Sequence, residues 1–314
     1  KRMSPEHFHQ QNRGGKGIKG MQTIENDYIE DLFMTTNHHH ILFFTNQGRV
    51  FRIKGYEIPE ASRTSRGTAL VNLLSLQENE KVTATLCLRD TNEEKYLILT
   101  TKKGIIKKTE LVQFANVRKN GMIAITLNEG DQLIEAKVLS EKEDIFLVTR
   151  KGMAIQFNEE DIRATGRSSM GVRGIRLNQG DEVIGMQKSS QGELFLLVSE
   201  KGYGKLTDKS SFKAQARGGK GIRCYKITDK TGDLVGFKLC DKDREILLIT
   251  TEGIMIRFNL DKVSILGRNT SGVKLMDIDK DSDTVIASVA KVREESAEEE
   301  EEAEKQDEET SEEK

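Results

Sequence analysis

The stretch Ile145-Phe146-Leu147-Val148-Thr149-Arg150-Lys151-Gly152 joins a short apolar run to a polar turn that ends in glycine. An apolar run of this length, rich in β-branched and aromatic side chains, is typical of a buried strand. The glycine that closes the turn supplies the positive φ that a tight hairpin needs. The stretch therefore predicts a strand, a hairpin turn and a second strand.

The same arrangement recurs about every fifty residues, which is the repeat length of a propeller blade. The apolar runs lie at 41–44, 96–99, 145–148, 194–198 and 246–249, and a Thr/Ser-x-x-Gly turn follows at 45–48, 101–104, 149–152, 199–202 and 250–253. Each repeat then continues with a second strand, a polar loop and a predicted second hairpin, whose turn reads Asn128-Glu129-Gly130-Asp131 in one copy. Four short strands per repeat predict an all-β fold built by radial repetition.

The polar loop of each repeat ends in Arg-x-x-x-Gly. Its copies are 13–17, 63–67, 118–121 (one residue shorter), 167–171, 217–221 and 268–272. Six copies predict six blades over residues 1–292. Because Lys1–Phe8 aligns with the second strand of later repeats, such as Lys107–Phe114, we expect the first blade to be one strand short. The missing strand is expected upstream in a longer parent protein.

Two copies of this loop are rich in glycine: Gln11-Asn12-Arg13-Gly14-Gly15-Lys16-Gly17 and Gln215-Ala216-Arg217-Gly218-Gly219-Lys220-Gly221. Three glycines around one lysine let the backbone and a cation approach a ligand closely, and a phosphate suits such a loop. The spacing is not that of a nucleotide-binding P-loop, because neither lysine is followed by Ser or Thr.

Equivalent loops occupy equivalent positions in a radial repeat, so the arginine loops are expected to ring one edge of a disc. We call their cations the basic belt. It consists of Arg13, Lys16, Arg63, Arg66, Arg118, Lys119, Arg167, Arg173, Arg217, Lys220 and Arg268. Each arginine could either contact a phosphate or brace two blades, and the sequence leaves both roles open. One phosphate contact per blade would give a salt slope of about −5.

The charge distribution also favours a polyanionic partner. The chain has a net charge of −2, but residues 294–314 hold 13 acidic and 2 basic residues, so residues 1–293 carry a net charge of +9. Exposed aromatic rings, on which single strands stack, are not interleaved with the belt, and Trp is absent. This favours duplex DNA, recognised through its backbone and shape.

Residues 293–314 are predicted to form a disordered acidic tail. Either the tail only increases solubility or it competes with DNA for the basic belt. If it competes, deleting 294–314 is expected to tighten DNA binding at low salt, where charge interactions are least screened. Titration of both chains with labelled duplex would measure this, and equal affinities would exclude competition.

The sequence gives no indication of an active site or a metal site within the chain. No Ser/His/Asp or Cys/His set has a supporting context, and the adjacent histidines His38, His39 and His40 cannot share one face of a strand. No apolar run approaches the length of a membrane span. The odd count of 3 cysteines predicts reduced thiols in a cytosolic protein.

The stretch Gln11–Gly17 resembles the "GyrA box", Gln-Arg-Arg-Gly-Gly-Lys-Gly, of the C-terminal domain of the DNA gyrase A subunit. Stretches such as 171–177 and 267–273 are also similar to that domain, and the resemblance extends from Lys1 to Val292. Asn12 stands where the family usually has Arg, so one cation of the box is missing.

The resemblance implies a six-bladed β-pinwheel whose blades exchange strands, a monomeric domain that binds and wraps duplex DNA. The implied DNA-binding residues are the belt cations together with Gln11, Gly14, Gly15 and Gly17. In the family, wrapping lets the A2B2 holoenzyme introduce negative supercoils by ATP-dependent strand passage. ATP and Mg²⁺ belong to that holoenzyme, with no cofactor expected in this chain. The catalytic tyrosine belongs to the N-terminal part of the A subunit, ATP is held by the B subunit, and the location is the bacterial cytoplasm, with the nucleoid.

Two other functions stay open from the sequence. A topoisomerase IV-type domain would tether DNA without strong wrapping, although the intact Gly-Gly-Lys-Gly argues against it. A propeller scaffold for acidic protein partners would bind DNA weakly and with little dependence on salt.

Overall fold

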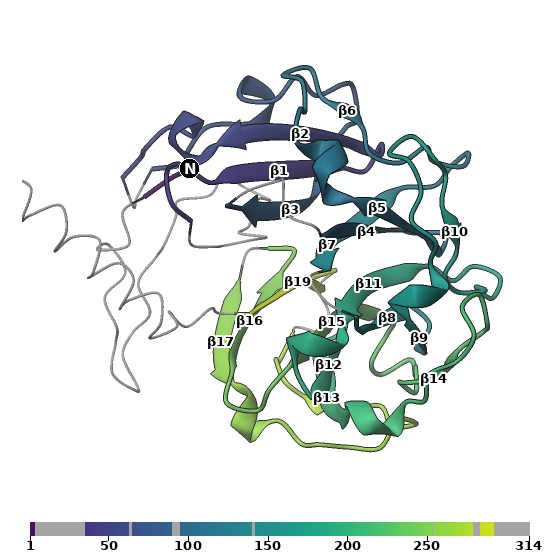
Figure 1. Ribbon diagram of the computed structural model, residues 1–314. Helices are drawn as coiled ribbons and strands as arrows, with labels where there is room; N and C mark the ends of the chain where they lie inside the picture. The colour runs from purple at the N-terminus through teal and green to yellow at the C-terminus, as the bar shows by residue number, and fades with distance from the viewer. Residues whose placement is uncertain are drawn as a thin grey trace, which may run out of the picture.

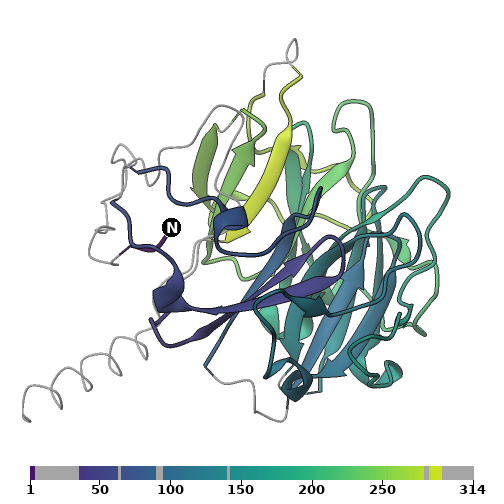
Figure 2. The same cartoon turned by 90° about the horizontal axis from the view of Figure 1, so that it is seen from above.

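The computed structural model describes residues 1–3, 35–62, 65–89, 95–139, 142–252, 254–278 and 283–291. Their strands form five small antiparallel sheets. The sheets succeed one another around a ring in chain order, from the sheet in purple-blue to the sheet in yellow-green (Figures 1 and 2). The all-β ring predicted from the repeats is therefore confirmed.

Each four-stranded sheet consists of an inner strand, two middle strands and an outer strand, in that order. The first sheet comprises β3 (Val82–Leu88), β1 (His40–Thr45), β2 (Arg49–Lys54) and β6 (Met122–Ile123). The second comprises β7 (Leu133–Leu139), β4 (Tyr96–Thr101), β5 (Ile105–Glu110) and β10 (Val172–Arg173). The third comprises β11 (Val183–Lys188), β8 (Asp144–Thr149), β9 (Met153–Asn158) and β14 (Ile222–Arg223).

The fourth sheet comprises β15 (Leu234–Cys240), β12 (Leu194–Ser199), β13 (Tyr203–Asp208) and β18 (Val273–Lys274). The fifth has three strands in the described residues, β19 (Ile286–Lys291), β16 (Glu245–Thr250) and β17 (Met255–Asn259). Short 3₁₀ helices connect the strands: η2 (Gly55–Glu57), η3 (Leu70–Asn72), η4 (Leu111–Phe114), η5 (Glu159–Asp161), η6 (Ser189–Gln191), η7 (Lys209–Ser211) and η8 (Leu260–Lys262). The inner strands lie toward the centre of the ring, and neighbouring inner strands contact one another (Figure 1).

The predicted hairpins with Thr/Ser-x-x-Gly turns are confirmed. β1 pairs with β2, β4 with β5, β8 with β9, β12 with β13 and β16 with β17. The turn glycines that are described all have positive φ, for example +84° at Gly152. The hydroxyl has a role too, because Thr149 Oγ1 accepts a hydrogen bond from Met153 N and donates one to Asp181 Oδ2 at 2.7 Å.

The predicted second hairpin is wrong. The strands on the two sides of the Asn128–Asp131 turn enter different sheets, since β6 pairs with β2 whereas β7 pairs with β4. The outer strand of each four-stranded sheet is thus supplied by the repeat that follows. This agrees with the strand exchange that the resemblance implied. The turn joins two blades instead of closing one.

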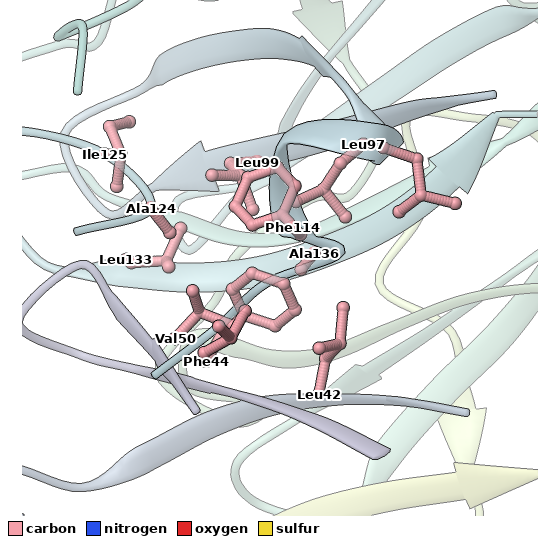
Figure 3. Close-up of a cluster of buried hydrophobic side chains, with 12 residues drawn as sticks. Leu42, Phe44, Val50, Leu97, Leu99, Phe114, Ala124, Ile125, Leu133 and Ala136 are labelled. Atoms are coloured by element: carbon pink, nitrogen blue, oxygen red, sulfur yellow. The ribbon is translucent and has the colours of Figure 1, made fainter. Parts of the chain in front are cut away.

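The hydrophobic core lies between adjacent sheets. In the first interface, Leu42 and Phe44 of β1 face Leu97 and Leu99 of β4, and all four side chains are fully buried (Figure 3). Side chains at alternate positions of β1, such as Ile41 and Phe43, pack on the other face of the same sheet. A middle strand that is buried on both faces needs an uninterrupted apolar run, which is the signal the sequence carries.

Most of the predicted first blade falls on residues 4–34, outside the described residues, so the count of six blades and the strand that this blade is expected to lack stay predictions. At the start of the chain, Arg2 forms a parallel bridge with Glu60. The same bridge joins Lys108 to Ala164 in a later repeat, so Arg2 occupies the register position of Lys108, as the alignment of Lys1–Phe8 predicts. Cys224 and Cys240 are buried free thiols, and the free thiol of Cys87 is half-buried.

Candidate nucleic-acid interface

The arginine loops lie beside the outer strands and connect one repeat to the next. In three of them the first arginine donates a hydrogen bond to the outer strand supplied by the preceding repeat. Arg167 Nη1 contacts Ile123 O at 2.6 Å, Arg217 Nη1 contacts Arg173 O at 2.5 Å and Arg268 Nη1 contacts Arg223 O at 3.2 Å. These three half-buried arginines are therefore braces between repeats, one of the two roles that the sequence left open.

A second hydrogen bond fastens each of these loops in the opposite direction. The main-chain N–H three residues beyond the braced carbonyl donates to a carbonyl of the loop. The pairs are Thr126 N to Ser169 O at 3.1 Å, Arg176 N to Gly219 O at 2.8 Å and Lys226 N to Thr270 O at 3.0 Å. Hydrogen bonds in both directions thus link each of these three loops to the outer strand beside it along the edge of the ring.

The glycine that ends each loop is required by the backbone. Gly171, Gly221 and Gly272 have φ of +83°, +73° and +75°. A Cβ at these positions would lie only 2.3–2.6 Å from a carbonyl oxygen of the neighbouring strand. These glycines allow the loop to turn tightly into the outer strand, so their role is conformational.

Exposed cations lie on and immediately after these loops. Arg173 and Arg223 are the second residues of β10 and β14, and Arg176 and Lys226 follow three residues later; all four are exposed. We call these four side chains the outer-edge cations. In the part of the chain that is described, no ion pair involves any of them. Because Arg217 and Arg268 bond to the carbonyls of Arg173 and Arg223, neighbouring repeats bring their cations together.

The two cations of the hairpin turn 149–152, Arg150 and Lys151, differ, since carboxylates neutralise them. Arg150 Nε contacts Asp233 Oδ2 at 2.9 Å, and Lys151 Nζ contacts the same oxygen at 2.8 Å. Burial raises the pKa of Asp233, but the hydrogen bonds from Lys151 and Arg150 outweigh it and hold that pKa below its ordinary value. This network joins two blades and leaves little free charge for a polyanion.

The structure places the sequence-predicted residues in three groups. Arg66, Arg118, Lys119, Arg173 and Lys220 are exposed, whereas Arg167, Arg217 and Arg268 are the braces just described. Gln11, Arg13, Gly14, Gly15, Lys16, Gly17 and Arg63 lie outside the described residues. Sequence reasoning missed Arg176, Arg223 and Lys226, although aligning Gly171–Arg176 with Gly221–Lys226 shows basic residues at equivalent positions.

Neither a metal site nor a membrane span is found in the described segments. No group of three or more His, Cys, Asp or Glu side chains there has an arrangement that could hold a metal ion. No described helix is both long and apolar enough to span a membrane.

A ring of small antiparallel sheets that exchange their outer strands, with loops fastened along its edge, defines a propeller-like domain of the pinwheel type. The family model described as "DNA gyrase C-terminal domain, beta-propeller" matches residues 1–36, 39–89, 95–140, 143–190, 193–241 and 244–289. The chain belongs to this family.

Similar proteins agree with this assignment. The DNA gyrase A subunit of Halalkalibacterium halodurans is 51% identical over 292 residues, which cover 93% of this chain and 35% of that protein. The DNA gyrase A subunit of Clostridium acetobutylicum is 46% identical over 298 residues, which cover 95% of this chain and 36% of that protein. The chain thus spans about a third of the length of these relatives.

Among solved structures, a DNA gyrase A C-terminal domain superposes with a TM-score of 0.74 at 26% identity and covers 92% of this chain and 94% of that one. The C-terminal domain of a DNA topoisomerase IV superposes with a TM-score of 0.76 at 23% identity, covering 86% and 84%. The second match is a likeness of fold alone.

Proposed function

We propose that this domain binds duplex DNA along its outer edge and bends it around the ring. The observation that carries the proposal is the contrast between two sets of cations. Arg150 and Lys151 of the hairpin turn 149–152 are neutralised by carboxylates, whereas the outer-edge cations are exposed and have no carboxylate partner among the described residues. Phosphates of a duplex that follows the edge would supply the missing counter-charge.

The repetition favours wrapping over contact at a single point. Bending a duplex around a small protein costs several kcal/mol. One loop contributes too few contacts to offset that cost, but equivalent contacts on successive blades act together. The proposed ring has six blades, with the sixth formed around Gln11–Gly17, and the domain is a monomer.

The proposed enzyme is DNA gyrase, since the relatives that cover this chain at about half identity are DNA gyrase A subunits. The domain would act with the N-terminal part of the A subunit, together with the B subunit, in an A2B2 assembly of the bacterial cytoplasm, at the nucleoid. Wrapping would present a crossed DNA segment to the cleavage gate, so that ATP-driven strand passage, with Mg²⁺, introduces negative supercoils. The domain itself contributes DNA binding and no catalytic group.

The test is topological. The 314-residue chain is incubated with relaxed circular DNA, a nicking-closing enzyme is added, and the change in linking number is measured at two salt concentrations. We expect a change that grows with protein and fades with salt, because about 0.9 counterions are released per phosphate contacted. Its sign gives the handedness of the wrap.

The other outcomes separate the alternatives. Tight binding without a change in linking number would contradict wrapping and favour a tethering domain of the topoisomerase IV type. Weak binding that salt does not affect would contradict DNA binding and favour a scaffold for acidic proteins. The control is the chain with Lys142 and Lys242 replaced by Gln. Both lysines are exposed, and they lie on the turns that lead from an inner to a middle strand, away from the outer edge.

A further inference from the structure

Two lysines are buried beneath arginine loops. Lys107 of β5 and Lys205 of β13 occupy the same register position, and their side chains are 1% and 0% exposed. Lys107 Nζ donates to Ala124 O at 2.7 Å and to Arg167 O. Lys205 Nζ donates to Gly267 O and Arg268 O, both at 2.7 Å, and to Thr270 Oγ1 at 3.1 Å.

Neither ammonium has a carboxylate partner in the described residues, so carbonyl and hydroxyl oxygens of the loops and of Ala124 replace the lost water. This is unusual, because a buried charge is normally paired with an opposite one. Lys108, the next residue along β5, follows the usual rule and forms an ion pair with Glu159. The ammonium groups of Lys107 and Lys205 thus orient main-chain carbonyl groups of the loops, although burying them requires a charge to lose its hydration.

Loops with a buried lysine beneath them alternate from blade to blade with loops that carry an exposed lysine of their own. Equivalent positions on β2 and β9 hold the buried apolar residues Phe51 and Ile155. The loops above those two, 118–121 and 217–221, carry an exposed lysine, Lys119 or Lys220. The loops above Lys107 and Lys205 read Arg167-Ser168-Ser169-Met170-Gly171 and Arg268-Asn269-Thr270-Ser271-Gly272, with no second cation. Each of these four loops therefore has one lysine, either on its surface or underneath.

A lysine underneath a loop fixes the direction of its peptide groups. In a planar trans peptide the N–H points opposite to the C=O. Carbonyls drawn inward at Arg167, Gly267 and Arg268 therefore turn the next N–H groups, those of Ser168, Arg268 and Asn269, toward solvent. Ser168 and Asn269 are exposed, and none of the three N–H groups has an acceptor among the described residues.

Further hydrogen bonds hold the adjacent peptide groups of each loop. In the first loop, Thr126 Oγ1 donates to Ser168 O at 2.6 Å, and Thr126 N donates to Ser169 O. In the second loop, Lys226 N donates to Thr270 O. The outward N–H groups, one in the first loop and two in the second, can donate to a phosphate that sits above a buried cation.

We propose that loops 167–171 and 268–272 bind duplex phosphates through the main-chain N–H groups of Ser168, Arg268 and Asn269, with Lys107 and Lys205 as the positioning residues that turn these donors outward. The proposal rests on the proposed function. It divides the edge into two kinds of phosphate site that alternate from blade to blade: side-chain sites at Lys119 and Lys220, and main-chain sites above a buried lysine. Both kinds ignore base identity.

The protonation of the two lysines supports this arrangement. Burial lowers the pKa of Lys107 to about 8, and the neighbouring Arg167 adds to the effect. Burial also lowers the pKa of Lys205 to about 8, with Cys224 opposing and Arg268 reinforcing the shift. The groups that face Lys205 titrate elsewhere, since burial raises the pKa of the Cys224 thiol and of the Tyr225 hydroxyl to about 12. Raising the pH from 7 to 9 thus removes most of the positive charge beneath both loops.

The test uses the 314-residue chain with Lys107 and Lys205 replaced by Met, singly and together, and a fluorescent duplex as the probe. At pH 7 we expect the double variant to bind about tenfold more weakly than the parent, with a salt slope reduced by about two. Between pH 7 and 9 the parent is expected to lose affinity toward the level of the double variant. The affinity of the double variant is expected to change much less, because Lys291, whose pKa burial also lowers to about 8, lies on the inner strand β19. The matched control is Ile155→Met, the same register position under a loop with its own lysine, which is expected to bind normally.

The outcomes separate this inference from the proposed function. If the double variant binds as tightly as the parent, or if the parent shows no loss between pH 7 and 9, the two loops are not main-chain phosphate sites, and the proposed function stands. If the parent chain does not bind duplex, the proposed function fails as well. Should the double variant not fold, the pH profile of the parent still decides the question.

Discussion

Replacement of Arg173 and Arg223 with Gln is expected to weaken duplex binding about tenfold or more at low salt and to reduce the salt slope by about two. Both guanidinium groups are exposed, at the second residue of an outer strand, and no described carboxylate neutralises them. Each lost phosphate contact removes nearly one released counterion. The loss is expected to be the same for different DNA sequences, because phosphate contacts do not read bases.

The fold is expected to survive this double replacement. Arg217 and Arg268 bond to the main-chain carbonyls of Arg173 and Arg223, which Gln retains. Lys142→Gln with Lys242→Gln removes the same charge from turns beside the inner strands and is expected to leave affinity nearly unchanged. If both double variants lose the same affinity, net charge and not the outer edge governs binding.

Gly221→Ala is expected to lower the free energy of unfolding by about 2–4 kcal/mol, from the cost of positive φ plus a steric clash. Gly221 has φ of +73°, and a Cβ would lie 2.3 Å from Ala154 O and 2.8 Å from Ala154 C. Backbone cannot move aside as a flexible side chain can, so the pairing of β14 with β9 must open. Denaturant unfolding monitored by circular dichroism would measure the change.

A second glycine separates the cost of positive φ from the cost of the steric clash. Gly180 has nearly the same φ, +72°, but an added Cβ there would meet nothing within 4 Å. Gly180→Ala is therefore expected to cost only about 1–2 kcal/mol, the backbone term alone. Equal losses for the two variants would show that the close approach of Gly221 to β9 is unimportant.

Much of this architecture could be predicted because its signals are local. A middle strand buried on both faces must be apolar throughout, and a tight turn needs glycine at one position, so Ile145–Gly152 carries both signals in eight residues. Because equivalent loops occupy equivalent positions in a radial repeat, the repeats then predicted that the arginine loops lie on one edge of the ring. The outer strands had no such signal. β6 is two residues long, too short for any periodicity, so nothing local indicated that it pairs with β2 of another repeat.

For the candidate site, the sequence predicted the arginine loops but left two roles open for each arginine. Arg167, Arg217 and Arg268 each bond to a main-chain carbonyl of the preceding repeat, which is the bracing role. Lys107 lies in Ile105-Ile106-Lys107-Lys108, where a lysine suggests a solvated strand face. Only the packing of the next loop over β5 shows that this side chain is buried.

The exchange of outer strands also determines how the ring would carry mechanical load. A bent duplex bound as proposed would pull outward on the loops, and each loop continues into a strand that belongs to the sheet of the preceding repeat. The force is therefore shared between two blades and acts partly along the short outer strands as shear, which loads their hydrogen bonds together. In a propeller with self-contained blades the same pull would peel a single edge strand, one bond at a time.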